Sequence, residues 1–207
     1  MLTSVHDQVF AIVVIDLSPL QLSRRSVFFD RDGVINRSPG TGYVLSPDEF
    51  ILAEGIGSLL KWLHKRGWLA IIVTSQRCVG KEIIDLSMLG SIHGCMQKGL
   101  KDRYGSNFDA IYAFTDLPGT ESWSKPRPGM IVQACKDYCI DPSESIMIGD
   151  QDRDIEMAQT ANIGCTIRVL DPEEDRPRLT KADECVETID QMIDRLKSII
   201  LQKNDII

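Results

Sequence analysis

The sequence predicts an α/β fold in which helices cover both faces of a mostly parallel sheet. From residue 26 onward, short apolar runs alternate with stretches of helical periodicity. This alternation is typical of strand–helix–strand units, whose strands lie parallel to one another. Polar residues directly follow several of the apolar runs. Because ligands of such sheets bind beyond the carboxyl ends of the strands, these polar residues are the candidates for a functional site.

The predicted strands are short apolar runs, as expected for strands that are buried on both faces. The first run covers residues 27–29 and ends at Asp30. The second covers residues 69–73 and ends at Thr74. The remaining strands are expected over residues 110–114, 145–148 and 165–170.

The predicted helices follow the strands in turn. The stretch 55–66 places Ile56 and Leu63 on one face, and Gly67 ends it. The other helices are expected over residues 81–104, 129–139, 152–161 and 186–201. Two longer connections, a loop rich in proline, glycine and serine and a solvated charged segment, are expected over residues 115–128 and 171–184.

The expected domain organisation is a single α/β domain over residues 26–207, preceded by an extension over residues 1–25. The extension contains an apolar run over residues 9–15. A histidine and an aspartate precede this run where a signal peptide carries positive charge, and the run is too short to cross a bilayer. We therefore interpret residues 8–16 either as a strand-like piece or as part of an extension without defined structure.

The composition disfavours several classes of function. The chain has 207 residues, and its 30 acidic against 23 basic side chains give a formal net charge of -7. A surface of this charge is a poor platform for nucleic acid. The six cysteines show no zinc-finger spacing and are typical of reduced thiols. We expect a cytoplasmic protein, a monomer or weak homodimer, with neither nucleic acid nor membrane as a partner.

Polar residues gather in four groups at or beyond the ends of the predicted strands. The groups cover residues 30–33, 74–76, 125–126 and 149–154. Carboxylates that meet in one cleft repel each other unless a cation lies among them, and oxygen ligands without histidine or cysteine favour Mg²⁺. A phosphate bound there would have Lys125 as a positive partner and the hydroxyl of Thr74 as a donor. One aspartate can act as a nucleophile, and a second one two residues later as general acid and then base.

The four groups resemble the motifs of the haloacid dehalogenase superfamily, in order and spacing, over residues 26 to about 170. The motifs stand here as Asp30-x-Asp32-Gly33-Val34, Thr74, Lys125 and Gly149-Asp150-x-x-x-Asp154. The resemblance implies a Rossmann-like fold without a large cap domain. It also implies that Asp30 is the nucleophile of an aspartyl-phosphate mechanism and that Asp32 is its acid/base.

The resemblance further implies how phosphate and metal are bound. Thr74, Ser75 and Lys125 would hold the phosphoryl group. The implied Mg²⁺ ligands are the carboxylates of Asp30 and Asp150 and the carbonyl of Asp32, with Asp154 as support for the site.

A narrower resemblance is to the branch that holds D-glycero-D-manno-heptose 1,7-bisphosphate phosphatase and histidinol phosphatase. The stretches that carry it are residues 28–36, 42–44, 73–76 and 125–130. It implies hydrolysis of a small phosphorylated metabolite. The heptose bisphosphate is the first expectation, and histidinol phosphate or another sugar phosphate is the alternative.

Two departures from that branch leave the substrate open. The loop over residues 115–124 lacks the cysteines and histidine of the branch's zinc loop, so we expect no structural zinc and expect Trp123 to hold the loop by packing. Ser124 stands where the branch often has an arginine before the lysine. The residues left open between a weak substrate contact and a solvated side chain are Arg31, Gln76 and Arg127.

Three other functions share part of this pattern. A phosphoacceptor receiver module lacks an acid/base two residues after its aspartate, so Asp32 argues against it. A non-catalytic binding protein on the same fold is disfavoured by the intact Asp30, Lys125 and Asp150. A polynucleotide phosphatase is disfavoured by the acidic charge. The histidines expected to have no role, because they lie outside the motifs, are His6, His64 and His93.

Overall fold

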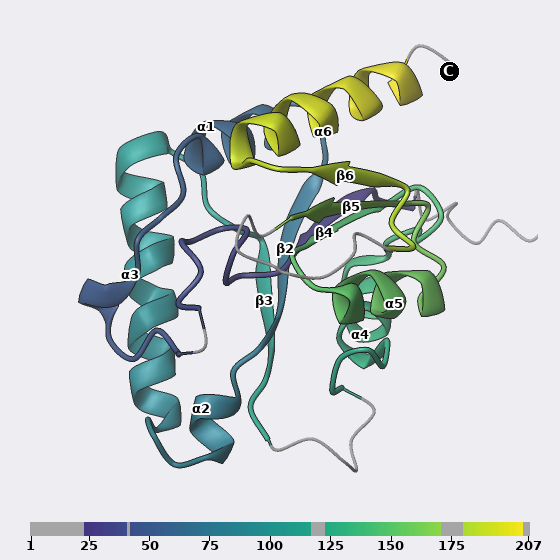
Figure 1. Ribbon diagram of the computed structural model, residues 1–207. Helices are drawn as coiled ribbons and strands as arrows, with labels where there is room; N and C mark the ends of the chain where they lie inside the picture. The colour runs from purple at the N-terminus through teal and green to yellow at the C-terminus, as the bar shows by residue number, and fades with distance from the viewer. Residues whose placement is uncertain (1–22, 41, 117–122, 171–179, 205–207) are drawn as a thin grey trace, which may run out of the picture.

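The computed structural model describes residues 23–40, 42–116, 123–170 and 180–204. It contains a six-stranded sheet with the order β3-β2-β1-β4-β5-β6, and all neighbouring strands run parallel. The predicted α/β class and parallel sheet are confirmed (Figure 1). Most of the expected extension, including the possible strand over residues 8–16, lies outside the described residues.

The first five strands begin and end close to where the apolar runs predict. Their bounds are β1 Ser26–Phe29, β2 Leu69–Ser75, β3 Ala110–Phe114, β4 Ile146–Gly149, β5 Cys165–Val169 and β6 Glu184–Val186. In the centre of the sheet, Val27 of β1 pairs with Ala70 of β2 on one side and with Ile146 of β4 on the other. All four residues of β1 are buried. Burial on both faces is the reason why the central strands β1, β2 and β4 are nearly continuous apolar runs.

The sixth strand was not predicted. Glu184 ends the segment that we expected to be a solvated connection, and Val186 was expected to begin the last helix, so both expectations were wrong at these residues. The last helix begins later, at Ile189. Only Val186 of this edge strand is buried, so the segment shows neither an apolar run nor a clear alternation. Pairing with β5 gives it strand structure, which the local sequence does not reveal.

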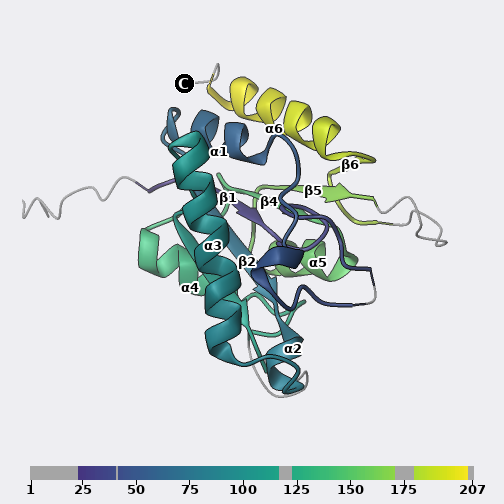
Figure 2. The same cartoon turned by 90° about the vertical axis from the view of Figure 1, so that its left-hand side faces the viewer.

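Helices cover both faces of the sheet. Their bounds are α1 Ile56–His64, α2 Arg77–Gly80, α3 Leu86–Tyr104, α4 Gly129–Tyr138, α5 Asp152–Thr160 and α6 Ile189–Asn204, with a 3-10 turn over Pro47–Glu49. Figures 1 and 2 show α1, α3 and α6 on one side of the sheet and α4 and α5 on the other. None of the helices in the described part of the chain is long and apolar enough to cross a membrane.

The core has two halves because alternate residues of β1 point to opposite faces of the sheet. Val27 and Phe29 pack with residues of α1, α3 and α6, whereas Phe28 packs with residues of α4 and α5. Asp30 directly follows β1 and Asp150 directly follows β4, so both lie at the carboxyl edge of the sheet.

The helix expected over residues 81–104 begins later than predicted. A four-residue turn of helix, α2, precedes it, and α3 starts at Leu86. Asp85 forms the N-cap, where its side chain accepts a hydrogen bond of 2.7 Å from the backbone N–H of Met88. This capping bond fixes the start of the helix and satisfies one of its free N–H groups.

Candidate active site

Residues from all four motif groups line one cleft at the carboxyl edge of the sheet. Asp30 follows β1, Thr74 lies near the end of β2, Asp150 follows β4, and Lys125 comes from the segment before α4. The cleft has a volume of about 400 Å³. Its walls are completed by residues from the loop after Asn36 and from the start of α5, namely Ser38, Pro39, Gly40, Gly42, Tyr43, Gln151 and Arg153, together with Asp32 and Ser75.

A second cavity of about 450 Å³ adjoins this cleft and shares Ser38 and Asp150 with it. Its walls are largely apolar and include Ile51, Leu52 and Val169. Asp30, Thr74 and Lys125 do not line it. The groups able to act on a phosphate ester therefore line the cleft. The neighbouring cavity adjoins the cleft on one side only, at Ser38 and Asp150.

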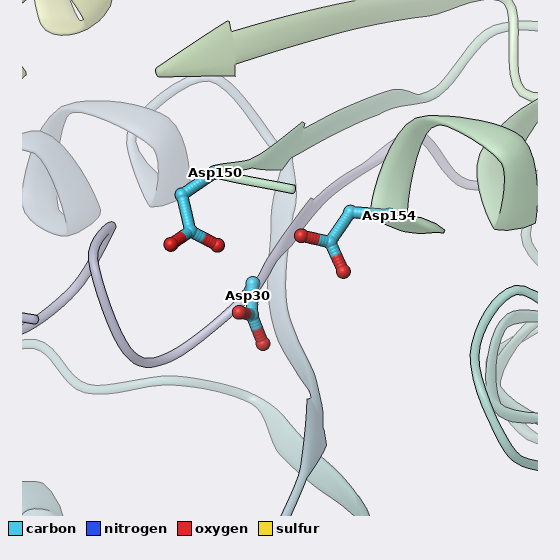
Figure 3. Close-up of side chains that lie close together, drawn as sticks. All are labelled: Asp30, Asp150 and Asp154. Atoms are coloured by element: carbon cyan, nitrogen blue, oxygen red, sulfur yellow. The ribbon is translucent and has the colours of Figure 1, made fainter. Parts of the chain in front are cut away.

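Three carboxylates meet at the base of the cleft (Figure 3). One oxygen from each of Asp30, Asp150 and Asp154 lies within 4.8 Å of the others. Burial and the charges of Asp30 and Asp154 raise the pKa of Asp150 to about 8. Burial also raises the pKa of Asp30, since it outweighs the opposing effect of Lys125. A divalent cation among these oxygens would offset the cost of burying the carboxylate charges and the repulsion between them. The donor set therefore fits a hard metal ion.

Lys125 is the buried cation of the cluster. Its Nζ atom donates a hydrogen bond of 2.7 Å to Asp30 and forms an ion pair of 2.8 Å with Asp154. Its side chain is only 1% exposed. Burial lowers the pKa of Lys125, but Asp154 and Asp30 outweigh burial and raise it overall. The ammonium group therefore stays charged beside the carboxylate that follows β1.

Asp154 connects this cluster to helix α5. It is fully buried, and its carboxylate accepts a hydrogen bond of 3.0 Å from the backbone N–H of Gln151 at the start of the helix. Gly149 makes this position possible, because a Cβ atom on it would lie 2.3 Å from the Cβ atom of Asp154. The Gly-Asp sequence at the end of β4 is thus required by close packing as well as by the carboxylates.

The carboxylate of Asp32 is held by a network of donors. Arg31 donates to it through Nε and Nη2 at 3.0–3.1 Å, Asn36 donates at 2.9 Å, and Gln76 donates at 3.0 Å. Gln76 also donates to the hydroxyl of Thr74 at 2.9 Å. Arg31 and Gln76 are buried, so neither is a solvated side chain, and neither lines the cleft. The structure places both against Asp32.

The segment around Lys125 contains the remaining predicted residues. Arg127 is exposed and does not line the cleft, and its backbone N–H donates to the carbonyl of Ser124 at 2.8 Å. The Trp123 ring lies 6.2 Å from the ring of Tyr112 and packs against the core beneath α4 and α5. This contact supports packing as the way in which the loop is held. Residues 117–122 of the loop lie outside the described part of the chain.

Two residues of the site were missed by sequence reasoning. Arg153 lines the cleft, and it has no ion-pair partner among the residues that the structure describes. Its place inside the Gly149–Asp154 motif was a signal that could have drawn attention to it. His93, from α3, places its Nε2 atom 3.3 Å from Nη1 of Arg31. No local feature of the sequence indicates this contact, because the two residues are 62 positions apart.

Comparisons with known proteins agree with this geometry. A family model described as HAD-hydrolase-like matches residues 122–197. A D-glycero-beta-D-manno-heptose-1,7-bisphosphate 7-phosphatase from Haemophilus ducreyi is 33% identical over 155 residues, which cover 72% of this chain and 84% of that protein. One from Photorhabdus laumondii is 33% identical over 172 residues, which cover 79% of this chain and 88% of that protein.

Solved structures share the fold. A D,D-heptose 1,7-bisphosphate phosphatase from B. bronchiseptica, complexed with magnesium and phosphate, superposes with a TM-score of 0.74 at 24% identity and covers 84% of this chain and 98% of its own. A phosphatase of the same name from Burkholderia thailandensis gives a TM-score of 0.61 at 22% identity, covering 84% and 99%. On the strength of the sequence relatives, this chain belongs to the haloacid dehalogenase-like phosphatases, the family that contains those heptose bisphosphate phosphatases.

Proposed function

We propose that the protein is a Mg²⁺-dependent phosphomonoesterase that removes one phosphate from D-glycero-D-manno-heptose 1,7-bisphosphate. The observation that carries the proposal is the cluster of Asp30, Asp150, Asp154 and Lys125 at the base of the cleft. The names of the relatives supply the choice of substrate and point to the phosphate on C7.

The metal site of the proposal uses the carboxylates of Asp30 and Asp150 and the backbone carbonyl of Asp32. The raised pKa of Asp150 supports this assignment, because a carboxylate in this position needs a positive partner to ionise at neutral pH. Mg²⁺ bound there would offset the negative charge of the phosphoryl oxygens. Asp154 also faces the cluster, but its contacts to Lys125 and to the first turn of α5 favour a supporting role.

In the proposed reaction, Asp30 attacks phosphorus and the bond to the leaving oxygen breaks. Asp32 donates a proton to that oxygen, so the sugar leaves as an alcohol. Water then attacks the aspartyl-phosphate while Asp32 takes a proton from it, and inorganic phosphate is released. Lys125, Thr74 and Ser75 orient the phosphoryl group and balance its charge. Ser75 lines the cleft beside Thr74, and its hydroxyl is buried without a hydrogen-bond partner among the described residues.

The second phosphate of the substrate needs a cationic partner in the cleft. Ser124 cannot supply one, and Arg127 does not line the cleft. Arg153 does line it, is exposed, and has no ion-pair partner in the described chain. We therefore assign the contact with the distal phosphate to Arg153. Arg31 and Gln76 are assigned to the support of Asp32 instead of to direct contact with the substrate.

A phosphate-release assay tests the proposal. The purified protein with Mg²⁺ should hydrolyse heptose 1,7-bisphosphate with a higher kcat/KM than histidinol phosphate, heptose 1-phosphate or glucose 6-phosphate. The Asp30→Asn variant, which keeps the shape of the side chain, serves as the inactive control. A preference for histidinol phosphate would move the substrate to the alternative. No release from any ester would refute the phosphatase assignment.

A further inference from the structure

Arg31 is a fully buried cation that the proposed chemistry does not use directly. Two of its nitrogen atoms, Nε and Nη2, donate to the carboxylate of Asp32, and they account for one side of the guanidinium group. A buried donor without a partner costs free energy, so the opposite side of the group also needs an acceptor. That acceptor comes from helix α3, 62 positions further along the chain.

The ring of His93 provides the acceptor. Its Nε2 atom lies 3.3 Å from Nη1 of Arg31. A guanidinium group only donates, so Nε2 must accept, and the ring must be neutral with its proton on Nδ1. Burial and the charge of Arg31 lower the pKa of His93 to about 4. The ring is therefore in the accepting form at neutral pH.

Arg31 makes three of the hydrogen bonds that orient Asp32, and Asn36 and Gln76 make one each. The side chain of Asp32 is a quarter exposed at the cleft, whereas that of Arg31 has no exposure. Arg31 binds both oxygen atoms of the carboxylate and so fixes its plane as well as its position. An arginine without a second anchor could rotate about its long side chain, which would leave the carboxylate with only the single bonds from Asn36 and Gln76. His93 is the only acceptor for Nη1 among the hydrogen bonds of the described residues.

We propose that His93 is a positioning residue for catalysis, which holds Asp32 in place through Arg31. The inference rests on the proposed function, since it assumes that Asp32 is the acid/base of a phosphatase. It adds a residue of α3, outside the four motifs, to the groups on which the rate depends. His93 touches neither the phosphate nor the metal ligands in this arrangement.

The dependence on the leaving group distinguishes positioning from general damage. Protonation by Asp32 matters most for the alkoxide of a sugar phosphate and least for p-nitrophenyl phosphate, whose leaving group is already stable. In single-turnover experiments, His93→Ala should slow transfer from the sugar phosphate by about tenfold or more, within the 10²–10⁴ that a general acid supplies. Transfer from p-nitrophenyl phosphate should change less than about twofold, and KM should stay near its wild-type value.

Two further variants complete the test. His93→Gln keeps an acceptor for Arg31 in its side-chain oxygen and should recover most of the lost rate. Cys95→Ser, on the exposed surface of the same helix, is the matched control and should behave as wild type. The inference would be overturned if His93→Ala slowed transfer from both esters equally. It would also be overturned if His93→Gln were no faster than His93→Ala while the melting temperature stayed unchanged.

A measurement without catalysis keeps the inference separate from the proposed function. Long-range ¹H–¹⁵N NMR of the histidine rings at pH 7 should show His93 neutral, with its proton on Nδ1, and His93→Ala identifies the signal. A charged ring, or a proton on Nε2, would overturn the inference even in an active enzyme. A wild-type protein inactive on every phosphate ester would refute the proposed function instead, while the NMR result would still report on the contact with Arg31.

Discussion

Mg²⁺ affinity should depend steeply on pH, because the carboxylate proposed to bind the metal is protonated in the metal-free cleft. The pKa of Asp150 is raised to about 8 by burial and by its neighbours Asp30 and Asp154. Mg²⁺ binds the ionised form, so metal binding must displace a proton below pH 8. The apparent affinity should then fall by about 50-fold between pH 8 and pH 6, with a slope that approaches tenfold for each pH unit.

The raised pKa of Asp150 also makes the stability of the metal-free protein depend on pH. The folded pKa of Asp150 lies above its ordinary value of 3.8, so the metal-free folded state retains a proton that the unfolded state loses. This contribution to stability is fully present below about pH 4 and is lost as the pH rises toward 8. Added Mg²⁺ should therefore raise the melting temperature more at pH 8 than at pH 6.

Isothermal titration calorimetry measures both the affinity and the proton. Titrations at pH 6, 7 and 8, in buffers with different ionisation enthalpies, give the number of protons released per metal. We expect about one proton at pH 6–7. Asp150→Asn should bind Mg²⁺ weakly and with less pH dependence, whereas Asp190→Asn, at an exposed site on α6, should match wild type. Tight binding that does not change between pH 6 and pH 8 would refute the reasoning.

Three further predictions concern specificity, packing and metal content. Arg153→Ala should lower kcat/KM for the bisphosphate by about tenfold or more while monophosphate hydrolysis changes little, and equal losses would remove Arg153 from the distal site. Gly149→Ala should destabilise the protein by about 1–3 kcal/mol, because its methyl group meets Asp154. Gly90→Ala, where a Cβ meets no atom within 4 Å, should leave the melting temperature unchanged or raise it. EDTA should abolish activity, Mg²⁺ should restore it, and Ca²⁺ should inhibit; one tightly bound zinc per chain would show that the loop before Lys125 was misinterpreted.

The central strands and the residues that follow them could be predicted because buried strands appear in the sequence as short apolar runs. β1, β2 and β4 are apolar along their length, and the polar residues at or beyond their ends, such as Asp30 and Asp150, interrupt that pattern abruptly. Parallel pairing then brings these positions to one edge. The motif spacing added Lys125, which comes from a loop and could not be placed by periodicity alone.

Other features depend on contacts between distant parts of the chain. β6 has strand structure because it pairs with β5, and only Val186 of its three residues is buried. The contact of His93 with Arg31 joins a helix to the segment after β1, and the sequence around His93 gives no sign of it. The ion pair of Lys125 with Asp154 is a similar case. The sequence indicates a supporting role for Asp154 only through the family resemblance.

The most direct test of the account is whether the phosphoryl group passes through Asp30. Enzyme mixed with the heptose bisphosphate and quenched in acid should carry one added phosphoryl mass on the peptide that contains Asp30, with more of it in Asp32→Asn, which cannot activate water. Asp30→Asn should lack the adduct, and its kcat should fall by on the order of 10³ or more. Near-normal turnover by Asp30→Asn, with no phosphoryl mass on Asp30 under any condition, would contradict the mechanism.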